Sequence, residues 1–512
     1  MFFRAQCVAP IFCMSSVSLA HAHPPFILVL DLGTSSLRAF LYDAFARAVD
    51  GFVARRAYEP QTDEKGQATF DPRAMFEAFC SALDELVAKV DFDIAAVAAS
   101  SLASNVLGLD ANDEPLTPAY LYSDTQNARA VAQLRAAYDW APIYARTGCP
   151  LHTSYLPARL FWLRETQPEI FARATRWVSL HEYFLMRLFG RAVVSHSFAA
   201  WSGMLNHATL DWDLQVLNIV GVAREQLSPL SSADAGLRGL RGEYATRWKR
   251  LAQIPWLPAL GDGALANLGS GCTDETRVAV TVGTSGAMRV IMPPSLSTAA
   301  LPRGLWLYRV DETDGLVGGS LNNGGNVLAY LARILQLPAR DELERALAVM
   351  PPDAHGLTLL PFFAGERSPG YRGDARAAVT GWSLSTTAVE IWRAALEAMA
   401  YQFAAIYALL RQTLAPPRAI IASGAALLHS PAWIQMLADV LGVPVTASGE
   451  AEASARGAAL MALRALHCIQ AFAALPAALG ETYASRAEHF EIYQRAQERQ
   501  KMLYHLLVER SA

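Results

Sequence analysis

Two short Gly-Thr-Ser turns and one isolated aspartate are the residues of this chain best suited to chemistry. In the first turn, Asp31-Leu-Gly-Thr-Ser-Ser36 follows directly on an apolar run. Glycine and hydroxyl residues in such a turn can aim N–H and O–H groups at phosphate oxygens. Asp31 at its start can hold a magnesium ion, as phosphoryl transfer requires. The alternative is a hairpin that only needed a small turn.

The second turn, Gly283-Thr284-Ser285-Gly286, has the same character and also follows an apolar run. The position that corresponds to Asp31 is Thr281, so only the first turn supplies an acid. This asymmetry fits a single metal ion that serves two phosphate-binding turns. The second turn could equally be a structural remnant of a duplication.

The isolated aspartate is Asp262, between Gly261 and Gly263. Phosphoryl transfer to a hydroxyl needs a carboxylate that accepts the hydroxyl proton, and an aspartate in a glycine-rich turn can serve. An aspartate that stabilises its own turn is the commoner role for Asp-Gly. A further small-residue stretch, Ser423-Gly424-Ala425-Ala426, follows a strand-like run and would let a flat adenine ring approach the backbone. Tight packing at the start of a helix explains it equally well.

The elements that must position these residues read as a mixed α/β protein. Strand-like runs at 26–31, 37–42 and 94–101 are interrupted by a helix that begins after Asp71. Another pair of strand-like runs, 277–282 and 287–292, surrounds the second turn, about 250 residues after the first. The remaining elements expected in the second half are helices at 326–335, 386–412, 431–441, 453–466 and 484–508, and strands at 419–422 and 444–446.

This repetition predicts an ancient duplication and therefore two domains. Prolines and glycines interrupt regular structure near residues 255–270. We predict an N-terminal domain over residues 25–260 and a C-terminal domain over residues 261–512. Residues 1–24 form an extension that reads either as a signal-like leader or as an over-called start, with Met14 as one alternative first residue. The first structural element is expected near Pro25.

Composition and charge restrict the function classes. The net charge of -4 gives no electrostatic support to a nucleic-acid partner. No run of eighteen apolar residues predicts a membrane span, and the six cysteines show no metal-ligand spacing. We expect a cytoplasmic protein with reduced cysteines, and a homodimer is one open arrangement.

In combination these stretches resemble the FGGY family of carbohydrate kinases, from about residue 27 to residue 466, and most of all its gluconate kinase branch. The stretches that carry the resemblance, in this order and spacing, are Thr147-Gly-Cys-Pro-Leu-His152, Glu182-Tyr-Phe184, Thr209-Leu-Asp-Trp-Asp213, Gly261-Asp-Gly263, Val282-Gly-Thr-Ser-Gly-Ala287, Asn322-Asn-Gly-Gly325 and Leu360-Pro-Phe-Phe-Ala-Gly-Glu-Arg-Ser-Pro369.

The resemblance implies an actin-like ATPase fold, with two duplicated ribonuclease-H-like domains around an interdomain cleft that closes on substrate. It implies that the N-terminal domain, 25–260, binds sugar and phosphate and that the C-terminal domain, 261–512, binds ATP. It implies that Asp262 is the general base, that Asp31 helps to hold Mg²⁺, and that Gly424 and Ala425 lie against the adenosine of ATP. The residues expected at the ATP phosphates are Gly33, Thr34, Ser35, Gly283, Thr284 and Ser285. The residues expected at the sugar are Ser104, Asn105, Asp124 and Asp262.

The chain departs from the family pattern chiefly on the sugar side. Ala103-Ser104-Asn105 stands where an aromatic or methionine followed by histidine is usual, and Gln126 where an arginine is usual. The usual lysine before Glu182 is His181, and an expected aspartate is Ser195. Because unmatched polar groups in a buried pocket are costly, such exchanges change selectivity strongly.

The sequence therefore predicts an ATP-dependent phosphotransferase that acts on an alcohol group of a small sugar acid or sugar, with gluconate giving 6-phosphogluconate as the leading case. A kinase for a ketose or polyol, such as xylulose or ribulose, is the alternative. A non-catalytic nucleotide switch of the actin-like fold is the other, but such a switch would have no use for Asp262.

Overall fold

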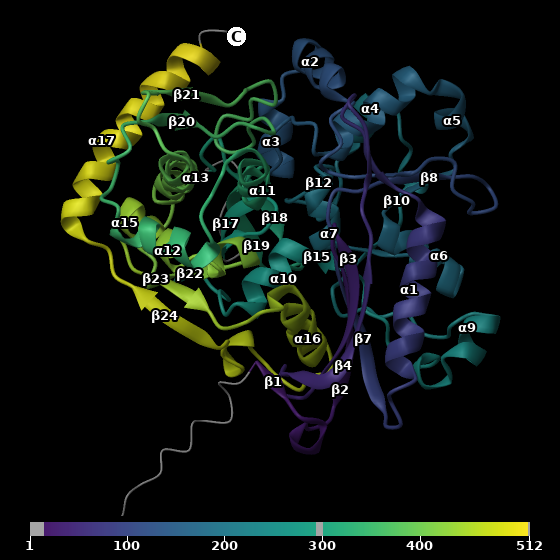
Figure 1. Ribbon diagram of the computed structural model, residues 1–512. Helices are drawn as coiled ribbons and strands as arrows, with labels where there is room; N and C mark the ends of the chain where they lie inside the picture. Colours follow the sequence, from purple (N-terminus) through teal and green to yellow (C-terminus); the bar gives the residue numbers. More distant parts are fainter. Residues whose placement is uncertain (1–14, 293–300, 510–512) are drawn as a thin grey trace, which may run out of the picture. The chain divides into compact units, whose positions relative to one another are not determined.

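The computed structural model describes residues 15–292 and 301–509 and divides into two compact units (Figure 1). Unit 1 comprises Met1–Thr273, Tyr308–Gly315 and Glu452–Leu479. Unit 2 comprises Asp274–Leu307, Leu316–Ala451 and Gly480–Ala512. Met14 and the possible leader before it lie outside the described residues.

The sheet of unit 1 has six strands in the order β1-β4-β3-β2-β7-β15. Their bounds are β1 Ser16–Val17, β2 Phe26–Leu32, β3 Ser36–Tyr42, β4 Ala48–Ala57, β7 Ile94–Ser101 and β15 Leu260–Gly261. The central strand β2 is buried along its whole length, as expected for an apolar run covered on both faces. It pairs antiparallel with β3 and parallel with β7, and β15 is parallel to β7 on the other side.

This register brings the ends of β2 and β15 to one edge of the sheet. Leu32 and Gly261 both pair with Ser101, the last residue of β7. Asp31 and Asp262 therefore lie at the same edge, about 10 Å apart by the spacing of neighbouring strands. The parallel pairing of β2, β7 and β15 thus places two acids that are far apart in the sequence at the same end of the sheet.

The helices of unit 1 cover this sheet and build an attached subregion. Helix α1, Pro72–Val87, begins at Asp71, whose carboxylate accepts from the N–H groups of Arg73 and Ala74. The other helices are α2 Ala128–Ala137, α3 Ala141–Thr147, α4 Leu156–Thr166, α5 Pro168–Arg173, α6 Leu180–Phe189, α7 His196–Trp201, α8 Leu214–Val220, α9 Gly242–Arg247, α10 Asp262–Gly269 and α16 Ala453–Ala465. Short strands complete it: β5 Gln61–Thr62, β6 Ala68–Phe70, β8 Leu107–Leu109, β9 Ala119–Tyr120, β10 Arg176–Val178, β11 Val194–Ser195, β12 Leu205–Asn206, β13 Asp211–Trp212 and β14 Leu230–Ser231.

The sheet of unit 2 has the order β18-β19-β17-β16-β22-β23-β24, and its edge strands extend into residues assigned to unit 1. The bounds are β16 Arg277–Val282, β17 Gly286–Met292, β18 Trp306–Arg309, β19 Gly315–Leu321, β22 Ala419–Ser423, β23 Val445–Ser448 and β24 Leu479–Tyr483. Strand β16 is antiparallel to β17 and parallel to β22, as β2 is to β3 and β7. The two sheets therefore repeat one arrangement, which agrees with the predicted duplication.

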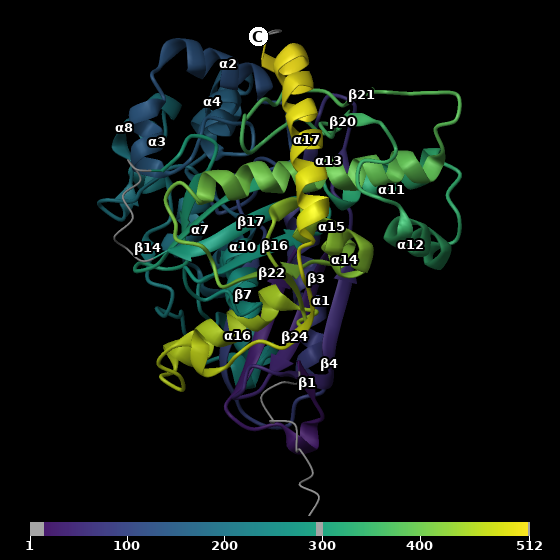
Figure 2. The same ribbon diagram turned by 90° about the vertical axis from the view of Figure 1, so that its left-hand side faces the viewer.

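The helices of unit 2 include the longest of the described chain, α13, Ala388–Leu410. It begins with a capping box in which Thr387 and Glu390 satisfy each other's backbone N–H groups. The others are α11 Gly325–Ile334, α12 Arg340–Val349, α14 Ala425–Leu428, α15 Pro431–Leu441 and α17 Ala487–Tyr504, with a small sheet of β20 Thr358–Leu360 and β21 Ala378–Thr380. Helix α17 crosses α13, and α15 lies beside both (Figure 2).

Two details differ from the sequence prediction. The first element is not near Pro25, because Ser16 and Val17 already pair with β4 and the carbonyl of His21 accepts from Arg47. The domain boundary predicted at residue 260 would assign α10 and α16 to the second half. In the structure both helices pack within unit 1, so the chain returns to unit 1 after most of unit 2 is complete.

Candidate active site

The first Gly-Thr-Ser turn joins β2 to β3 and presents its hydroxyl groups to solvent. Gly33 N–H donates to the carbonyl of Ser36 at 3.1 Å, which closes the turn. Tyr58 holds it from behind, since its hydroxyl donates to the carbonyl of Gly33 at 2.7 Å. Thr34 is half-buried and Ser35 is exposed, so both can meet a ligand.

Asp31 lies just before this turn and is buried against an arginine. Its carboxylate accepts from Arg38 Nη2 at 2.5 Å, and Arg38 also pairs with Glu452 at the start of α16. Burial raises the pKa of Glu452, although Arg38 opposes this shift. Two carboxylates thus share one guanidinium, which leaves a net negative charge at the end of β2.

Asp262 is the first residue of α10 and is half-buried, while Gly261 before it is fully buried. A carboxylate at a helix N-terminus is stabilised by the exposed N–H groups of the first turn. The helix is fixed by close packing on α16. A Cβ on Gly269 would lie 1.8 Å from the carbonyl oxygen of Ala453, and one on Gly457 would lie 2.0 Å from that of Leu265. Only glycine permits this approach, and it locks the position of Asp262.

The second turn joins β16 to β17 in unit 2 and is supported by the start of α11. Gly325 N–H donates to the carbonyl of Gly283 at 2.8 Å, and Asn326 N–H to that of Thr284 at 3.0 Å. A Cβ on Gly325 would lie 2.5 Å from the Gly283 carbonyl, whereas a Cβ on Gly283 itself would meet nothing within 4 Å. The turn is therefore tightly packed behind and open in front, as a phosphate-binding turn must be.

Thr281, the counterpart of Asp31, also contacts an arginine of the neighbouring strand, but through an uncharged hydroxyl group. Its hydroxyl accepts from Arg289 Nη2 at 2.9 Å and lies 2.8 Å from the hydroxyl of Ser423. Gly424 follows with φ of +87°, and a Cβ there would lie 2.4 Å from the carbonyl of Val282. Ala425 begins α14 and is exposed, so it is accessible to a ring.

Three of the predicted sugar residues are engaged inside unit 1. Ser104 has φ of +55°, and its hydroxyl donates to the carbonyl of Trp201 at 2.6 Å. The side chain of Asn105 donates to the carbonyl of Leu102 and accepts from Leu180 N–H. A role of these two residues at the sugar stays a prediction, and it would require exchange of these bonds.

Asp124 is fully buried and forms an internal ion pair. Its carboxylate accepts from Arg159 Nη1 at 2.6 Å and from the N–H groups of Gln126 and Ala68. In the structure this side chain joins α4 to the strands beside it. Its assignment as a sugar contact also stays a prediction.

The positions that depart from the family pattern receive a structural account. The hydroxyl of Ser195 caps α7 and donates to the carbonyl of Ala259 at 2.6 Å, two residues before Gly261. His181 is buried, and desolvation lowers its pKa to about 4, so its ring is neutral at pH 7. Ser195 therefore fixes the backbone just before Gly261, and neither residue adds a charge at pH 7.

An aromatic cluster beside Gly261 was missed from the sequence. A Cβ on Gly261 would lie 2.5 Å from Trp201 Nε1, so the indole lies directly over this residue. Trp201 stacks on Tyr308 with ring centroids 4.0 Å apart, and Tyr308 shares a 2.6 Å hydrogen bond with the hydroxyl of Tyr155. Tyr308 belongs to a segment that follows the predicted domain boundary, so no local signal linked it to Asp262.

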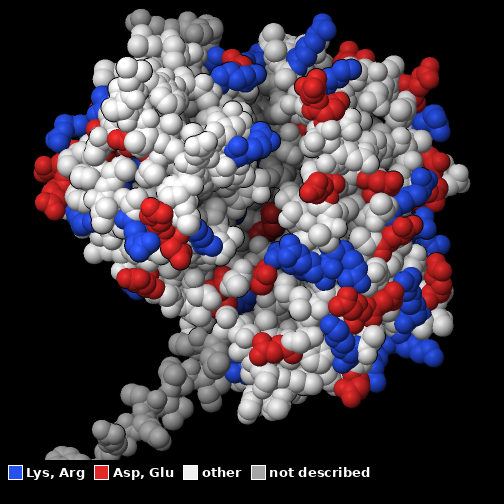
Figure 3. Space-filling model, in the orientation of Figure 1, with Lys and Arg blue, Asp and Glu red and all other residues white. Residues whose placement is uncertain are grey.

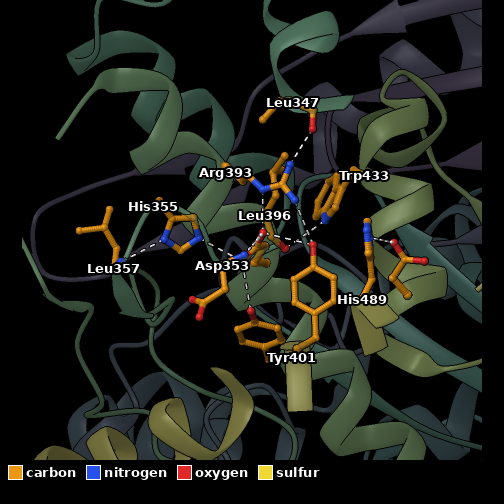
Figure 4. A network of polar contacts seen from close by, with 12 residues as sticks. Leu347, Asp353, His355, Leu357, Arg393, Leu396, Tyr401, Trp433 and His489 are labelled. Carbon is orange, nitrogen blue, oxygen red and sulfur yellow. Dashed lines mark hydrogen bonds and ion pairs between the residues drawn. The ribbon is translucent and has the colours of Figure 1, made fainter. Parts of the chain in front are cut away.

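A second polar cluster, in unit 2, has the composition of a metal site but the bonding of a structural network (Figure 4). Its carboxylates and imidazole come from Asp353, His355 and Glu397. Leu357 N–H donates to His355 Nδ1, which leaves Nε2 as the donor to Glu397 at 3.0 Å. Arg393 Nε donates to Glu397 at 2.7 Å.

Burial would raise the pKa of Glu397, but the contacts with His355 and Arg393 outweigh it and hold this pKa below its usual value. Because the imidazole lone pair and the carboxylate oxygens are already used, we interpret the cluster as a brace between α13 and the loop before β20.

Comparison with known proteins assigns the family. The N-terminal domain model of the FGGY family of carbohydrate kinases matches residues 26–269, and its C-terminal domain model matches residues 278–466. The chain belongs to the FGGY family of carbohydrate kinases. It is therefore a phosphotransferase that acts on an alcohol group, with the actin-like ATPase fold, and kinases of this family use ATP.

Similar proteins include kinases of several acceptors. The chain is 28% identical over 473 residues to a gluconokinase of Bacillus subtilis, covering 90% of this chain and 91% of the relative. It resembles the crystal structure of a gluconate kinase from Lactobacillus acidophilus with a TM-score of 0.85, 27% identity, and 94% and 98% coverage. A ligand-bound xylulose kinase from the same organism gives a TM-score of 0.86 at the same identity and coverage.

The surface and the helices add two observations. On the face shown in Figure 3, basic and acidic side chains are mostly interspersed, and a short band of adjacent basic side chains lies near the centre of the view. Within residues 15–292 and 301–509, no helix is both long enough and apolar enough to cross a membrane.

Proposed function

We propose that this FGGY kinase transfers the γ-phosphoryl group of ATP to a hydroxyl group of a small sugar acid, with gluconate giving 6-phosphogluconate. The observation that carries the proposal is the half-buried carboxylate of Asp262, fixed at the start of α10 on the same sheet edge as Asp31. The similarity to gluconokinases over most of the chain supports the choice of gluconate.

In the proposed mechanism, Asp262 accepts the proton of the acceptor hydroxyl as its oxygen attacks the γ-phosphorus, and ADP leaves. Phosphoryl transfer demands mainly position and charge neutralisation. Thr34 and Ser35, with Gly33, bind phosphate oxygens through hydroxyl and N–H groups. Gly283, Thr284 and Ser285 do the same from the second turn, and Gly424 and Ala425 lie against the adenosine.

The residues present fit a magnesium ion. Asp31 and Glu452 both pair with Arg38, so two carboxylates at the end of β2 share one paired guanidinium, and a hard cation prefers such oxygen ligands. Asp31 would hold Mg²⁺ directly or through water, and the ion would neutralise phosphate charge. The protein is proposed to work in the cytoplasm, where ATP is available.

Within the acceptor site we assign the selectivity to the cluster of Trp201, Tyr308 and Tyr155. The indole of Trp201 packs closely against the backbone of Gly261 and stacks on the Tyr308 ring. The backbone carbonyl of Trp201 accepts a hydrogen bond from the hydroxyl of Ser104. An indole fixed in this way cannot move aside, and it limits the size of an acceptor that reaches Asp262. A ketose acceptor such as xylulose is the second candidate, favoured by the equal likeness to a xylulose kinase.

A coupled assay of ADP release with Mg-ATP tests the proposal against gluconate, other aldonates, xylulose, ribulose, glycerol and several polyols. We expect gluconate to give the highest kcat/KM. A higher kcat/KM with xylulose or another acceptor would assign that substrate instead. If no acceptor stimulates ADP release although ATP binds, the protein is a nucleotide switch and the proposal is wrong.

A further inference from the structure

A cavity of about 690 Å³ lies within unit 2, between α13, α15 and α17. One wall is the face of α13 that carries Ala404, Ala405 and Ala408. The opposite wall is the face of α17 that carries Gln494, Gln497, Gln500 and Tyr504, and Glu366 lies at the end near the loop before β21. This volume is typical of sites for small molecules.

The cavity exists because α13 and α17 meet only along part of their lengths. Gln402 donates to Gln500 at 3.3 Å and Arg393 to the hydroxyl of Tyr493 at 3.1 Å. Beyond this contact the wall formed by α13 carries Tyr407 together with the alanines, and the cavity lies where this wall faces α17. Figures 1 and 2 show the two helices crossing. Phe490 of α17 and Leu441 of α15 close the apolar side.

One buried polar group in this cavity has no partner. Gln497 is only 9% exposed, and its Nε2 makes no hydrogen bond. A buried donor without an acceptor destabilises the folded protein. Its neighbours Gln402 and Gln500 are equally buried but bonded to each other. The unpaired amide at the cavity wall therefore indicates a ligand that brings an acceptor.

The charges restrict the class of this ligand. Of the described residues at the cavity, only Lys501 is cationic, and it is already paired with Glu498 at 2.6 Å. Glu366 and Glu509 are the acids. Such a lining does not suit a phosphate or another strong anion, which would need arginine or lysine. Amides opposite a wall of alanines and Tyr407 suit a neutral ring with carbonyl acceptors on its edge.

We propose that this cavity is a second ligand site, which binds an uncharged nucleoside through the amide of Gln497. This site is independent of the proposed kinase substrate. Hydrogen bonds also link the loop at one end of this cavity to the second Gly-Thr-Ser turn. Glu366 follows Ala364 and Gly365, whose carbonyls accept from Asn322 and Asn323, directly before α11.

The start of α11 in turn bonds the carbonyls of Gly283 and Thr284, as described above. A nucleoside that displaces the loop at Glu366 therefore changes the turn that we assign to the ATP phosphates. The ligand is expected to act as a regulator of ATP affinity.

Calorimetric titration tests the site with uridine, cytidine, guanosine and adenosine as probes, and with D-glucose and sucrose as neutral sugars. The protein is first saturated with a non-hydrolysable ATP analogue, so that the catalytic site takes up no adenosine. We expect saturable binding of at least one nucleoside. Gln497→Leu should weaken it about tenfold, and Ala405→Phe, which fills the cavity, should abolish it.

Ala136→Phe, on the exposed face of α2, is the matched control and should bind as the wild type does. Gln497→Leu removes an unpaired amide, so it should fold at least as stably as the wild type. If no nucleoside binds saturably up to its solubility, or if binding survives both substitutions in the cavity, the proposal is wrong. Binding of the sugars alone would overturn the ligand class.

The coupling is measured separately, as the Kd of the ATP analogue with and without the nucleoside. We expect a change of about fivefold or more. An unchanged Kd with a bound nucleoside would exclude regulation through the loop at Glu366. Because both readouts are binding constants, neither depends on the identity of the sugar substrate.

Discussion

At the scale of single residues, the acceptor site that we propose consists of side chains that hold the backbone and of aromatic rings that limit space. Ser104 lies in the segment where an aromatic or methionine followed by histidine is usual, and Ser195 stands where an aspartate is expected. Both donate to backbone carbonyls near Trp201 and Gly261. Their effect on the acceptor is therefore indirect. The indole of Trp201 is the group that we expect to contact the acceptor itself.

Trp201→Ala should change acceptor selectivity without changing the use of ATP. Removal of the indole opens space above Gly261, so kcat/KM should rise for acceptors longer than the best wild-type substrate. It should fall tenfold or more for that substrate, which loses its positioning. Steady-state kinetics over the acceptor panel measure this, with Trp382→Ala at an exposed tryptophan as control. An unchanged order of acceptors would remove Trp201 from the selectivity account.

At the scale of elements, glycine permits close helix packing at Gly457 and leaves open space in the turn at Gly283. Alanine substitutions at the two positions separate these two functions. In Gly457→Ala the new Cβ would lie 2.0 Å from the carbonyl of Leu265, so α16 must move away from α10. In Gly283→Ala the Cβ enters open space. The added methyl group therefore clashes with the backbone at position 457 and meets no atom at position 283.

We expect Gly457→Ala to lower the free energy of unfolding by about 2 kcal/mol or more, as overpacking does, although alanine is normally the better helix residue. Gly283→Ala should leave stability unchanged within about 0.5 kcal/mol and raise KM for ATP. Denaturant unfolding and ATP kinetics of both variants check this. Equal stability of the two variants would contradict the packing of α10 on α16.

The loop before β21 contains a carboxyl group, Glu366, whose pKa is raised in the folded protein. Burial raises the pKa of Glu366 to about 7, against the bonds from Tyr504 and Gly370. Because the folded pKa lies above the unfolded value of 4.5, folding favours the protonated form. The contribution of the protonated Glu366 side chain to the free energy of unfolding is fully present below pH 4.5 and is lost as the pH rises to about 7.

Glu366→Gln keeps the neutral shape and should remove this dependence. Between pH 4.5 and 7.5, the wild type should lose about 3 kcal/mol of stability relative to the variant, as its pKa shift requires. Parallel urea titrations of both proteins at several pH values measure the difference. Stability curves that remain parallel would show that Glu366 titrates normally.

At the scale of the whole molecule, the sequence was informative wherever a pattern is local. The strands expected from strand-like runs at 94–101 and 277–282, and the helix expected at 431–441, have the predicted bounds. The two turns and Gly261-Asp-Gly263 were found because glycine next to hydroxyl or acid is a local signal. The duplication was visible as a repeat of such a signal.

What the sequence could not show depends on distant segments. Tyr308 joins Trp201, and Glu452 joins Arg38, through packing of late segments on the first sheet. The ion pair of Asp124 with Arg159 also joins residues 35 positions apart. Asp31 and Asp262 share an edge only because β15 pairs with the end of β7. None of these contacts has a signature in the residues nearby.

The central claim is that Asp262 accepts the proton of the sugar hydroxyl. The most direct measurement compares gluconate-dependent ADP release by the wild type, by Asp262→Asn and by Asp50→Asn, an exposed acid on β4 that serves as control. We predict that Asp262→Asn lowers kcat about 10²–10⁴-fold, with an unchanged Kd for the ATP analogue and unchanged stability, and that Asp50→Asn matches the wild type. Turnover of Asp262→Asn at the wild-type rate would contradict the account.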